Sequence, residues 1–367
     1  MHLKQLSLAN YKNIKQSDLR FVPKINCILG NNGEGKTNLL DAIYYLSFCK
    51  SYTNPADSQN INHEEDYFVL NGEYERKDST EVIYCALQRK RPKQFKRNKK
   101  KYNKLSEHIG LLPLVMVSPI DSKLVLDGSD ERRKYIDGVI SQFDKAYLDT
   151  LIAYNKILLQ RNSYLKQAFS KAFDAELMAV WDEQLDVLAQ DIYKKREDFV
   201  RELIPVFQHY YSFISGYREN VVLEYQSDMK EGPLLPQLQA ARQKDMALGY
   251  TTKGIHKDDL KFLLEDYPIK RLGSQGQQKT YLTALKFAQY EFISKRSGNT
   301  PILLLDDIFD KLDSHRVEKI VELVSGEDFG QIFITDTNRE HLYDILEKIG
   351  KEYCVFFVEN GEIKRKS

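Results

Sequence analysis

Short apolar runs separated by polar turns dominate the chain between residues 2 and 87, and they predict β-strands. The run at 25–29 is almost wholly apolar, which is typical of a buried strand. Residues 2–9 alternate partly between apolar and polar, and after a polar turn residues 17–22 predict the return strand of a hairpin. Two further β-rich runs occupy 67–74 and 81–87. The first part of the chain is therefore expected to be mixed, with antiparallel strands beside a buried one.

Apolar residues recur at helical spacing from residue 130 to about residue 211. Two long segments, through 147–158 and 177–192, predict an antiparallel helical pair with a bend at 173–175. Neither segment is long enough for an extended coiled coil of many heptads. Residues 226–253 are polar and contain several Gly and Pro, so they predict a connection.

Alternating helix and strand patterns return near the C-terminus. Residues 282–292 have apolar side chains at helical spacing, and the apolar runs at 301–305 and 330–335 predict strands of a parallel sheet. The helical block therefore interrupts an α/β region. We predict a discontinuous α/β head formed by 1–120 and 251–367, with an inserted helical arm formed by 121–250.

Between the strand at 25–29 and a helical pattern at 38–46 lies a complete phosphate-binding sequence, G-x-x-x-x-G-K-T. Glycines let successive backbone N–H groups turn inward, and the helix start adds its positive dipole end. Lys36 is expected to reach the β- and γ-phosphates of ATP, and the Thr37 hydroxyl to bind Mg²⁺. The residues expected to contact the nucleotide are Gly30, Asn31, Asn32, Gly33, Glu34, Gly35, Lys36, Thr37 and Asn38.

The strand at 301–305 ends in Asp306 and Asp307, an arrangement that usually accompanies a phosphate loop. Asp306 is expected to hold Mg²⁺ together with Thr37. Asp307 is expected to orient or deprotonate the attacking water, and with Lys36 it forms the predicted catalytic pair. The alternative for Asp306 is a strand-end acid that caps a turn.

Residues 89–104 contain ten Lys or Arg and no acid, with Phe95 and Tyr102 among them. One interpretation is a DNA-phosphate contact, and the other is a solvated hairpin. The sequence leaves both open. The candidate DNA-binding residues are Lys96, Arg97, Lys99, Lys100 and Lys101.

The composition of the chain narrows the range of possible functions. A net charge of +1 over 367 residues means that any nucleic-acid surface must be local. There is no apolar run of transmembrane length and no signal peptide at the first residues, so we expect a cytoplasmic protein without a membrane partner. The four cysteines form no Cys-x-x-Cys pair and predict small buried residues rather than a metal site or disulfide.

A second glycine-rich turn, at 273–278, precedes the predicted helix of the C-terminal region and forms a potential anion site. Alone it is a weak signal. About 30 residues before Asp306, it resembles the signature motif of ABC-type ATPase heads.

The ordered set of motifs resembles the RecF family of the SMC/ABC ATPase superfamily. Four positions depart from the usual family pattern: Thr53, Ile120, Lys257 and Lys279. We find no mechanism from the residues themselves for the Gly-x-His-x-Asp-Asp segment. The segments that carry the resemblance are residues 1–13, 33–44, 129–137, 254–260, 273–280 and 303–313.

The resemblance implies an ABC/SMC-type head with an inserted helical arm, and ATP used as a switch with weak, DNA-stimulated hydrolysis. It implies an ATP-dependent homodimer in which Ser274, Gly276 and Gln277 cap the γ-phosphate held by Lys36 of the partner subunit. It also implies binding to duplex DNA and to junctions of single and double strands, help in recombinase loading, and RecO, RecR and RecA as partners.

Two other classes of function compete with a DNA-repair ATPase: an SMC-like structural ATPase, and a P-loop kinase or transporter ATPase. An SMC-like chromosome-associated structural ATPase would need long coiled-coil arms or a Cys-x-x-Cys hook. A transporter ATPase would more typically show Leu-Ser-Gly-Gly-Gln and a histidine in the strand near residue 334. A P-loop kinase would not explain the second anion site.

Overall fold

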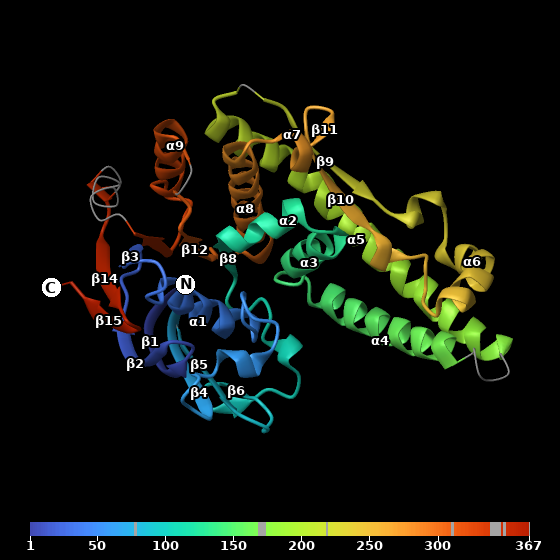
Figure 1. The fold of residues 1–367 in the computed structure, drawn as a ribbon, viewed down its shortest axis with the longest axis horizontal. Helices are drawn as coiled ribbons and strands as arrows, with labels where there is room; N and C mark the ends of the chain where they lie inside the picture. The colour runs from blue at the N-terminus through green and yellow to red at the C-terminus, as the bar shows by residue number, and fades with distance from the viewer. Residues whose placement is uncertain are drawn as a thin grey trace. The chain divides into compact units, whose positions relative to one another are not determined.

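The computed structural model describes residues 1–76, 79–167, 174–217, 219–309, 312–337, 346–347 and 350–366 (Figure 1). The chain forms two compact units. The first comprises Met1–Ser122, Tyr210–Tyr217 and Ser274–Ser367, and the second comprises Lys123–His209 and Arg218–Gly273.

The first unit contains an antiparallel sheet in the order β2-β1-β4-β5-β6-β7. The first two strands form the predicted hairpin, with Leu6 opposite Leu19. Leu6, Leu8, Leu70 and Ile83 are buried on one face of the sheet, as the alternation in these strands predicts. The strands are β1 (His2–Tyr11), β2 (Ile14–Arg20), β4 (Tyr67–Arg76), β5 (Ser79–Gln88), β6 (Gln94–Arg97) and β7 (Lys100–Lys101).

A second sheet of this unit has the order β15-β14-β3-β13-β12-β8, in which all pairs but β14–β15 are parallel. Its three strands β3, β13 and β12 are buried along their whole length, which is typical of a parallel sheet covered on both faces. Their carboxyl ends therefore meet along one edge. The strands are β3 (Ile25–Leu29), β8 (Leu114–Val117), β12 (Ile302–Asp306), β13 (Ile332–Asp336), β14 (Tyr353–Glu359) and β15 (Glu362–Arg365).

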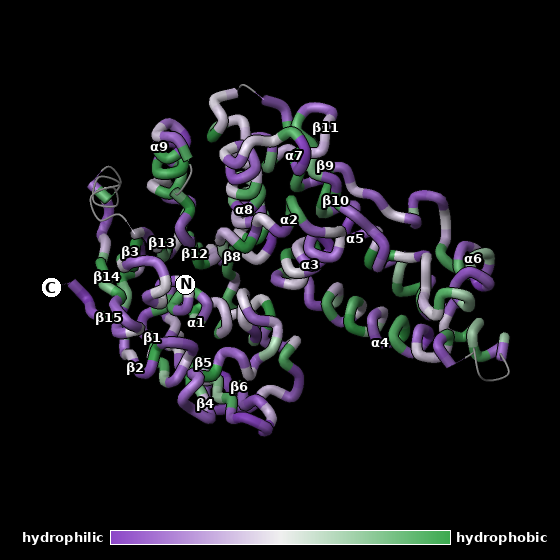
Figure 2. Tube along the Cα trace, in the orientation of Figure 1, coloured by the Kyte–Doolittle hydropathy of each residue, from purple (hydrophilic) through white to green (hydrophobic). Residues whose placement is uncertain are grey.

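The helix that follows the phosphate loop, α1, contributes to the core between the two sheets. Leu39, Leu40, Ile43 and Leu46 on α1 belong to one buried cluster with residues of both sheets. The amphipathic α9 shows hydrophobic and hydrophilic segments side by side in the tube of Figure 2. The helices of this unit are α1 (Lys36–Phe48), α8 (Gln275–Ser297) and α9 (Ser314–Val324), with short 3₁₀ turns η1 (Asp57–Asn60), η2 (Leu105–Glu107) and η3 (Pro119–Asp121).

The second unit is mainly helical and carries a small sheet in the order β11-β10-β9. Its long helices confirm the predicted helical block. Of the predicted bend at 173–175, residue 173 lies outside the described residues, as do residues 168–172 before it. The helices are α2 (Ser122–Leu126), α3 (Ser129–Ile140), α4 (Lys145–Gln167), α5 (Ala175–Ser215), α6 (Leu234–Leu248) and α7 (Ile269–Leu272), with η4 (Asp228–Glu231) and η5 (Ile255–Lys257). The strands are β9 (Val221–Gln226), β10 (Asp259–Leu264) and β11 (Tyr267–Pro268).

The prediction that residues 226–253 form an irregular connection is wrong, because most of this segment is helix α6. Helix α6 buries only Leu234, Leu238 and Asp245, so its apolar periodicity is weak. Helix α6 is held by polar contacts instead. The Arg161 guanidinium of α4 donates to Asp245 on α6 and to Asp182 on α5, with N–O distances of 2.8 and 2.7 Å. All three side chains are fully buried.

This ion triad gives a stability prediction. Asp245→Ala should lower the free energy of unfolding by roughly 1.5–3 kcal/mol, because it removes a buried charge-assisted hydrogen bond of Arg161, whose remaining carboxylate partner in the triad is Asp182. Lys244→Ala, at the exposed neighbouring position on α6, is the matched control and should change little. Thermal unfolding followed by circular dichroism measures both. Equal midpoints for the two variants would show that the triad does not hold α6.

Candidate nucleotide site

The phosphate loop runs from the end of β3 to the start of α1, as predicted. Gly33 and Gly35 have φ angles of 85° and 121°, a region that favours glycine. Gly30 is required by close approach, because a Cβ there would lie 2.5 Å from the carbonyl oxygen of Val358. The loop backbone therefore has the conformation that the glycines of the motif allow.

Side chains and backbone outside the loop hold it in place. Asn13 donates from Nδ2 to the carbonyl of Glu34 (2.8 Å) and accepts at Oδ1 from Asn38 (2.8 Å). The N–H of Gly361 donates to the same Glu34 carbonyl at 3.0 Å, and the N–H of Asn360 donates to the Glu34 carboxylate. Glu34 and Asn38, both predicted to contact the nucleotide, thus also anchor the loop to the β1–β2 and β14–β15 turns.

Lys36 lies against the loop that it follows. Its Nζ donates to the carbonyls of Gly30 at 2.9 Å and Asn31 at 3.1 Å, and the residue is 4% exposed. An ammonium in this position faces the segment whose N–H groups form the anion cradle.

Asp306, at the end of β12, receives three hydroxyl hydrogen bonds. Thr37 Oγ1 lies 3.0 and 3.1 Å from its two oxygens, Ser118 Oγ lies 3.1 Å from Oδ2, and Thr335 Oγ1 lies 2.9 Å from Oδ1. Burial raises the pKa of Asp306, while these hydroxyls and the charge of Lys36 oppose the shift.

The donor set fits Mg²⁺, which prefers oxygen ligands in an octahedron with bonds of about 2.1 Å. Two ligands at adjacent corners of such an octahedron lie about 3 Å apart. The separation of Thr37 Oγ1 and Asp306 Oδ1 is 3.0 Å. These two oxygens could therefore bind one ion together without moving apart.

Asp307 follows in a strained conformation, with φ of 45°. Its N–H donates to Thr335 Oγ1 at 2.9 Å, and its carbonyl accepts from Lys279 Nζ of α8 at 3.0 Å. Burial raises the pKa of Asp307, Asp306 and Asp336 add to the shift, and Lys36 opposes it. A carboxylate with a raised pKa is better suited to accept a proton from water.

Ser274 and Gln277 cap the start of α8 by binding each other. Ser274 Oγ accepts from the N–H of Gln277 at 3.2 Å, and Gln277 Oε1 accepts from the N–H of Ser274 at 2.8 Å. The carbonyl of Gly276 accepts from Thr280 at 2.8 Å. The three residues of the predicted second anion site thus lie together on α8, an element separate from the loop.

Ser118 and Thr335 are site residues that the sequence analysis missed. Ser118 directly follows β8, and Thr335 lies near the end of β13. These strands flank β12 in the sheet, so their carboxyl ends lie beside Asp306. A search for polar residues at the ends of all predicted parallel strands would have included Thr335.

The basic run forms a hairpin of β6 and β7, closed by Asn98 and Lys99 with φ of 48° and 70°. Arg97 donates from Nε to Glu81 at 2.8 Å and thereby lowers the pKa of that carboxyl. Lys96 Nζ lies 5.4 Å from the centre of the Tyr84 ring. Lys99, Lys100 and Lys101 are exposed. The hairpin is compatible with both interpretations of the run.

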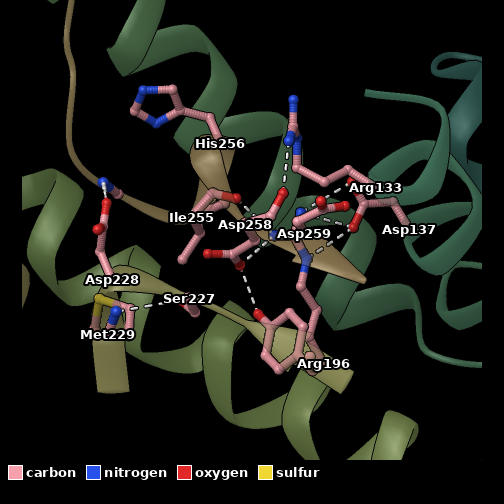
Figure 3. A network of polar contacts seen from close by, with 12 residues as sticks. Arg133, Asp137, Arg196, Ser227, Asp228, Met229, Ile255, His256, Asp258 and Asp259 are labelled. Carbon is pink, nitrogen blue, oxygen red and sulfur yellow. Dashed lines mark hydrogen bonds and ion pairs between the residues drawn. The ribbon is translucent and has the colours of Figure 1, made fainter. Parts of the chain in front are cut away.

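The Gly-x-His-x-Asp-Asp segment lies in a polar network of the second unit (Figure 3). The Asp258 carboxylate accepts from Arg196 (2.8 Å) and from the Tyr225 hydroxyl (2.5 Å), and its carbonyl accepts from Arg133 (2.6 Å). The Asp259 carboxylate accepts two hydrogen bonds from the Arg132 guanidinium, at 2.7 and 3.1 Å. The segment therefore joins α3, α5, β9 and β10.

His256 is buried beside this network, 2.8 Å from the Tyr154 hydroxyl. Burial lowers the pKa of His256 to about 4, which leaves the ring neutral near neutral pH. These contacts give His256, Asp258 and Asp259 a structural role within the second unit.

A family model described as the RecF/RecN/SMC N terminal domain matches residues 2–364. A protein of Phocaeicola vulgatus named DNA replication and repair protein RecF is 59% identical over 365 residues, which are 99% of this chain and 98% of that protein. The chain belongs to the RecF family. A relative of the same name from Flavobacterium johnsoniae is 50% identical over 357 residues, covering 97% of this chain and 99% of that protein.

Solved structures agree with this family assignment. One described as the recombination mediator protein RecF-ATP in the RecFOR pathway superposes with a TM-score of 0.90 at 30% identity, covering 100% of this chain and 98% of that chain. An SMC head bound to the C-winged helix domain of ScpA gives a TM-score of 0.60 at 16% identity, covering 100% and 97%, and shows the fold alone. The predicted ABC/SMC-type head with mixed sheets is confirmed.

Among the described residues, none of the helices has the length and apolar character required to cross a bilayer.

Asp307 gives a prediction with two readouts. Asp307→Asn should slow ATP hydrolysis by about 100-fold or more if Asp307 acts on the attacking water, and should leave ATP affinity unchanged. It should also raise the melting temperature, because it removes a carboxylate that is partly buried near two other acids.

The stability gain has a definite pH dependence. The pKa of Asp307 is raised in the folded state, so ionisation of this group disfavours folding as pH rises above the unfolded value of about 3.9. The variant's advantage in melting temperature should therefore be larger at about pH 7 than at about pH 4. A normal turnover rate would contradict the catalytic role, and an advantage that does not depend on pH would contradict the electrostatic account.

Proposed function

We propose that this chain is an ATP-dependent, DNA-binding recombination mediator that acts in DNA repair and replication restart. One observation carries the proposal: Thr37 of the phosphate loop and Asp306 at the end of β12 meet at 3.0 Å, beside Lys36. The full-length likeness to a structure described as RecF-ATP supports it.

The loop from Gly30 to Asn38 binds ATP, with Lys36 on its phosphates and Thr37 and Asp306 on Mg²⁺. Mg²⁺ supplies charge neutralisation at the phosphates, and Asp307 orients the attacking water with Thr335 positioning its backbone. Hydrolysis is weak and DNA-stimulated, so ATP acts mainly as a switch.

DNA phosphates bind the β6–β7 hairpin. Lys99, Lys100 and Lys101 are exposed there, and Arg97 keeps one side of its guanidinium engaged with Glu81. Lys96 is the remaining residue proposed to bind DNA. Non-specific phosphate contacts suit a protein that recognises duplex DNA and junctions by shape rather than by base sequence.

ATP closes a homodimer in which Ser274, Gly276 and Gln277 face the γ-phosphate held by Lys36 of the partner subunit. The predicted head of 1–120 and 251–367 includes residues 251–273, which belong to the second unit instead. The ATPase head of each subunit is therefore proposed as 1–120 and 274–367, and the arm as 121–273. RecO, RecR and RecA are the proposed partners, and the proposed location is the cytoplasm. The alternative of an SMC-like structural ATPase has support at the level of fold alone.

Lys36→Ala tests the nucleotide site. Losing a charge-assisted contact of roughly 1.5–3 kcal/mol should weaken ATP binding about 10- to 100-fold. Fluorescence titration with a labelled ATP analogue measures the affinity, and circular dichroism checks the fold. Wild-type affinity in the variant would refute the assignment of the loop.

The hairpin is tested by its salt dependence. Replacing Lys99, Lys100 and Lys101 with Ala should weaken DNA binding on every sequence and reduce the log–log salt slope by about two to three. Lys364→Ala, a surface lysine on β15, is the control. If the slope stays unchanged in the triple variant, the run is a solvated hairpin.

The dimer is tested by Ser274→Arg, which adds bulk and positive charge at the start of α8. We expect this variant to stay monomeric in sedimentation with a non-hydrolysable ATP analogue, Mg²⁺ and duplex DNA, while it still binds ATP. Gln190→Arg, an exposed position on α5, controls for the added charge. A wild type that remains monomeric, or a Ser274→Arg variant that dimerises normally, would rule out the proposed ATP-dependent homodimer.

A further inference from the structure

The segment that carries the basic hairpin is fastened at both ends to the last turn of α1. Lys93 precedes β6, and its Nζ donates to the carbonyl of Cys49 at 2.6 Å. His108 follows η2, and its Nε2 lies 2.7 Å from the carbonyl of Leu46. Leu46 lies in the last turn of α1, and Cys49 is its C-cap. We call Lys93 and His108, with these two carbonyls, the staple.

Lys93 belongs to the basic run by sequence but points inward. Besides Cys49, its ammonium binds Asp57 Oδ2 at 2.7 Å and the Tyr45 hydroxyl at 3.1 Å. The Tyr45 hydroxyl in turn donates to Asp57 Oδ1 at 2.6 Å. The three N–H donors of Lys93 therefore have three acceptors, and its side chain is only 14% exposed. Such a lysine is poorly placed to contact a DNA phosphate.

His108 fastens the other end as a neutral ring. Burial lowers the pKa of His108 to about 4. The contacts then define its tautomer: Nε2–H donates to Leu46, and Nδ1 accepts from the Tyr102 hydroxyl at 2.9 Å. The ring packs edge-on against Phe95 of β6, with centroids 4.8 Å apart. Phe95 is 1% exposed, so a core residue of the hairpin is locked to the same helix turn.

The two ends of α1 consequently contact two different segments of the first unit, the phosphate loop and the segment that carries the basic hairpin. Its first residues are Lys36 and Thr37 of the phosphate loop, and its last carbonyls bind the staple. Carbonyls at a helix C-terminus lack partners within the helix, and a cation there is favoured by the helix dipole. The helix is 13 residues long and none of its residues is exposed, so it can act as a rigid element between its two ends.

We infer that the staple couples DNA on the exposed hairpin lysines to ATP on the phosphate loop through α1. Lys93 and His108 are positioning residues in this scheme and touch neither ligand. The inference rests on the proposed function, because it requires that both ligands bind. Coupling between two sites is reciprocal, so ATP must tighten DNA binding by the same factor by which DNA tightens ATP binding.

The experiment measures duplex-DNA affinity by fluorescence anisotropy over a range of salt, with and without a non-hydrolysable ATP analogue and Mg²⁺. The ratio of the two affinities is the coupling factor, expected in the usual range of about 5- to 150-fold for the wild type. Lys93→Met should bring this factor close to one while its ATP affinity and its salt slope stay at wild-type values. Lys104→Met, an exposed lysine of the same run, is the matched control and should keep the coupling factor.

Two results for Lys93→Met would overturn the inference: a wild-type coupling factor, or a salt slope lowered by about one, which would make Lys93 a direct DNA contact. If Lys93→Met fails to fold, Asp57→Asn replaces it, because the Asp57 side chain is 34% exposed and asparagine keeps its shape. An unchanged coupling factor in Asp57→Asn then overturns the inference. A wild type that binds both ligands with a factor of one also overturns it, whereas a wild type that binds no ATP or no DNA refutes the proposed function instead.

Discussion

The hydrogen bond from Thr37 to Asp306 joins two residues that lie 269 positions apart, and the geometry of the site depends on it. The parallel sheet makes the contact possible. β13 pairs with both β3 and β12, so the loop after β3 and the acids after β12 open onto the same edge. Thr335, near the end of β13, fills the position between them and binds both acids. The order of the strands in the sheet thus brings the phosphate loop and the two acids together, although they lie far apart in the sequence.

Buried charges serve different purposes in the two units. In the second unit, Arg161 and Arg196 each bind two carboxylates, and these ion pairs join helices α3, α4, α5 and α6. In the first unit, burial raises the pKa of Asp306 and Asp307, and Asp307 also has a strained φ. Such unfavourable features persist where the surrounding structure enforces them, and they are typical of sites that bind ions or perform chemistry.

Much of the ATPase head could be predicted from sequence, because its signals are local. The loop motif, the apolar strands β3, β12 and β13, and the capped start of α8 are each specified by a few neighbouring residues. Helix α6 could not be predicted, because it is held by the ion pair of Asp245 with Arg161, which lies far away in the sequence on α4, rather than by an apolar face. Ser118 was missed for a similar reason: only sheet order shows that it meets Asp306. Likewise, the sequence does not show that Lys93, one of ten basic residues in its run, has a mostly buried side chain.

In the proposed function, Thr37 and Asp306 together hold one Mg²⁺ beside bound ATP. Isothermal titration of ATP into the wild type and into Asp306→Asn, each with Mg²⁺ and with a chelator, tests this most directly. We predict that Mg²⁺ strengthens ATP binding to the wild type and has little effect on the variant, because one of the two protein ligands has lost its charge. Absence of ATP binding to the wild type, or an equal response to Mg²⁺ in both proteins, would contradict the claim.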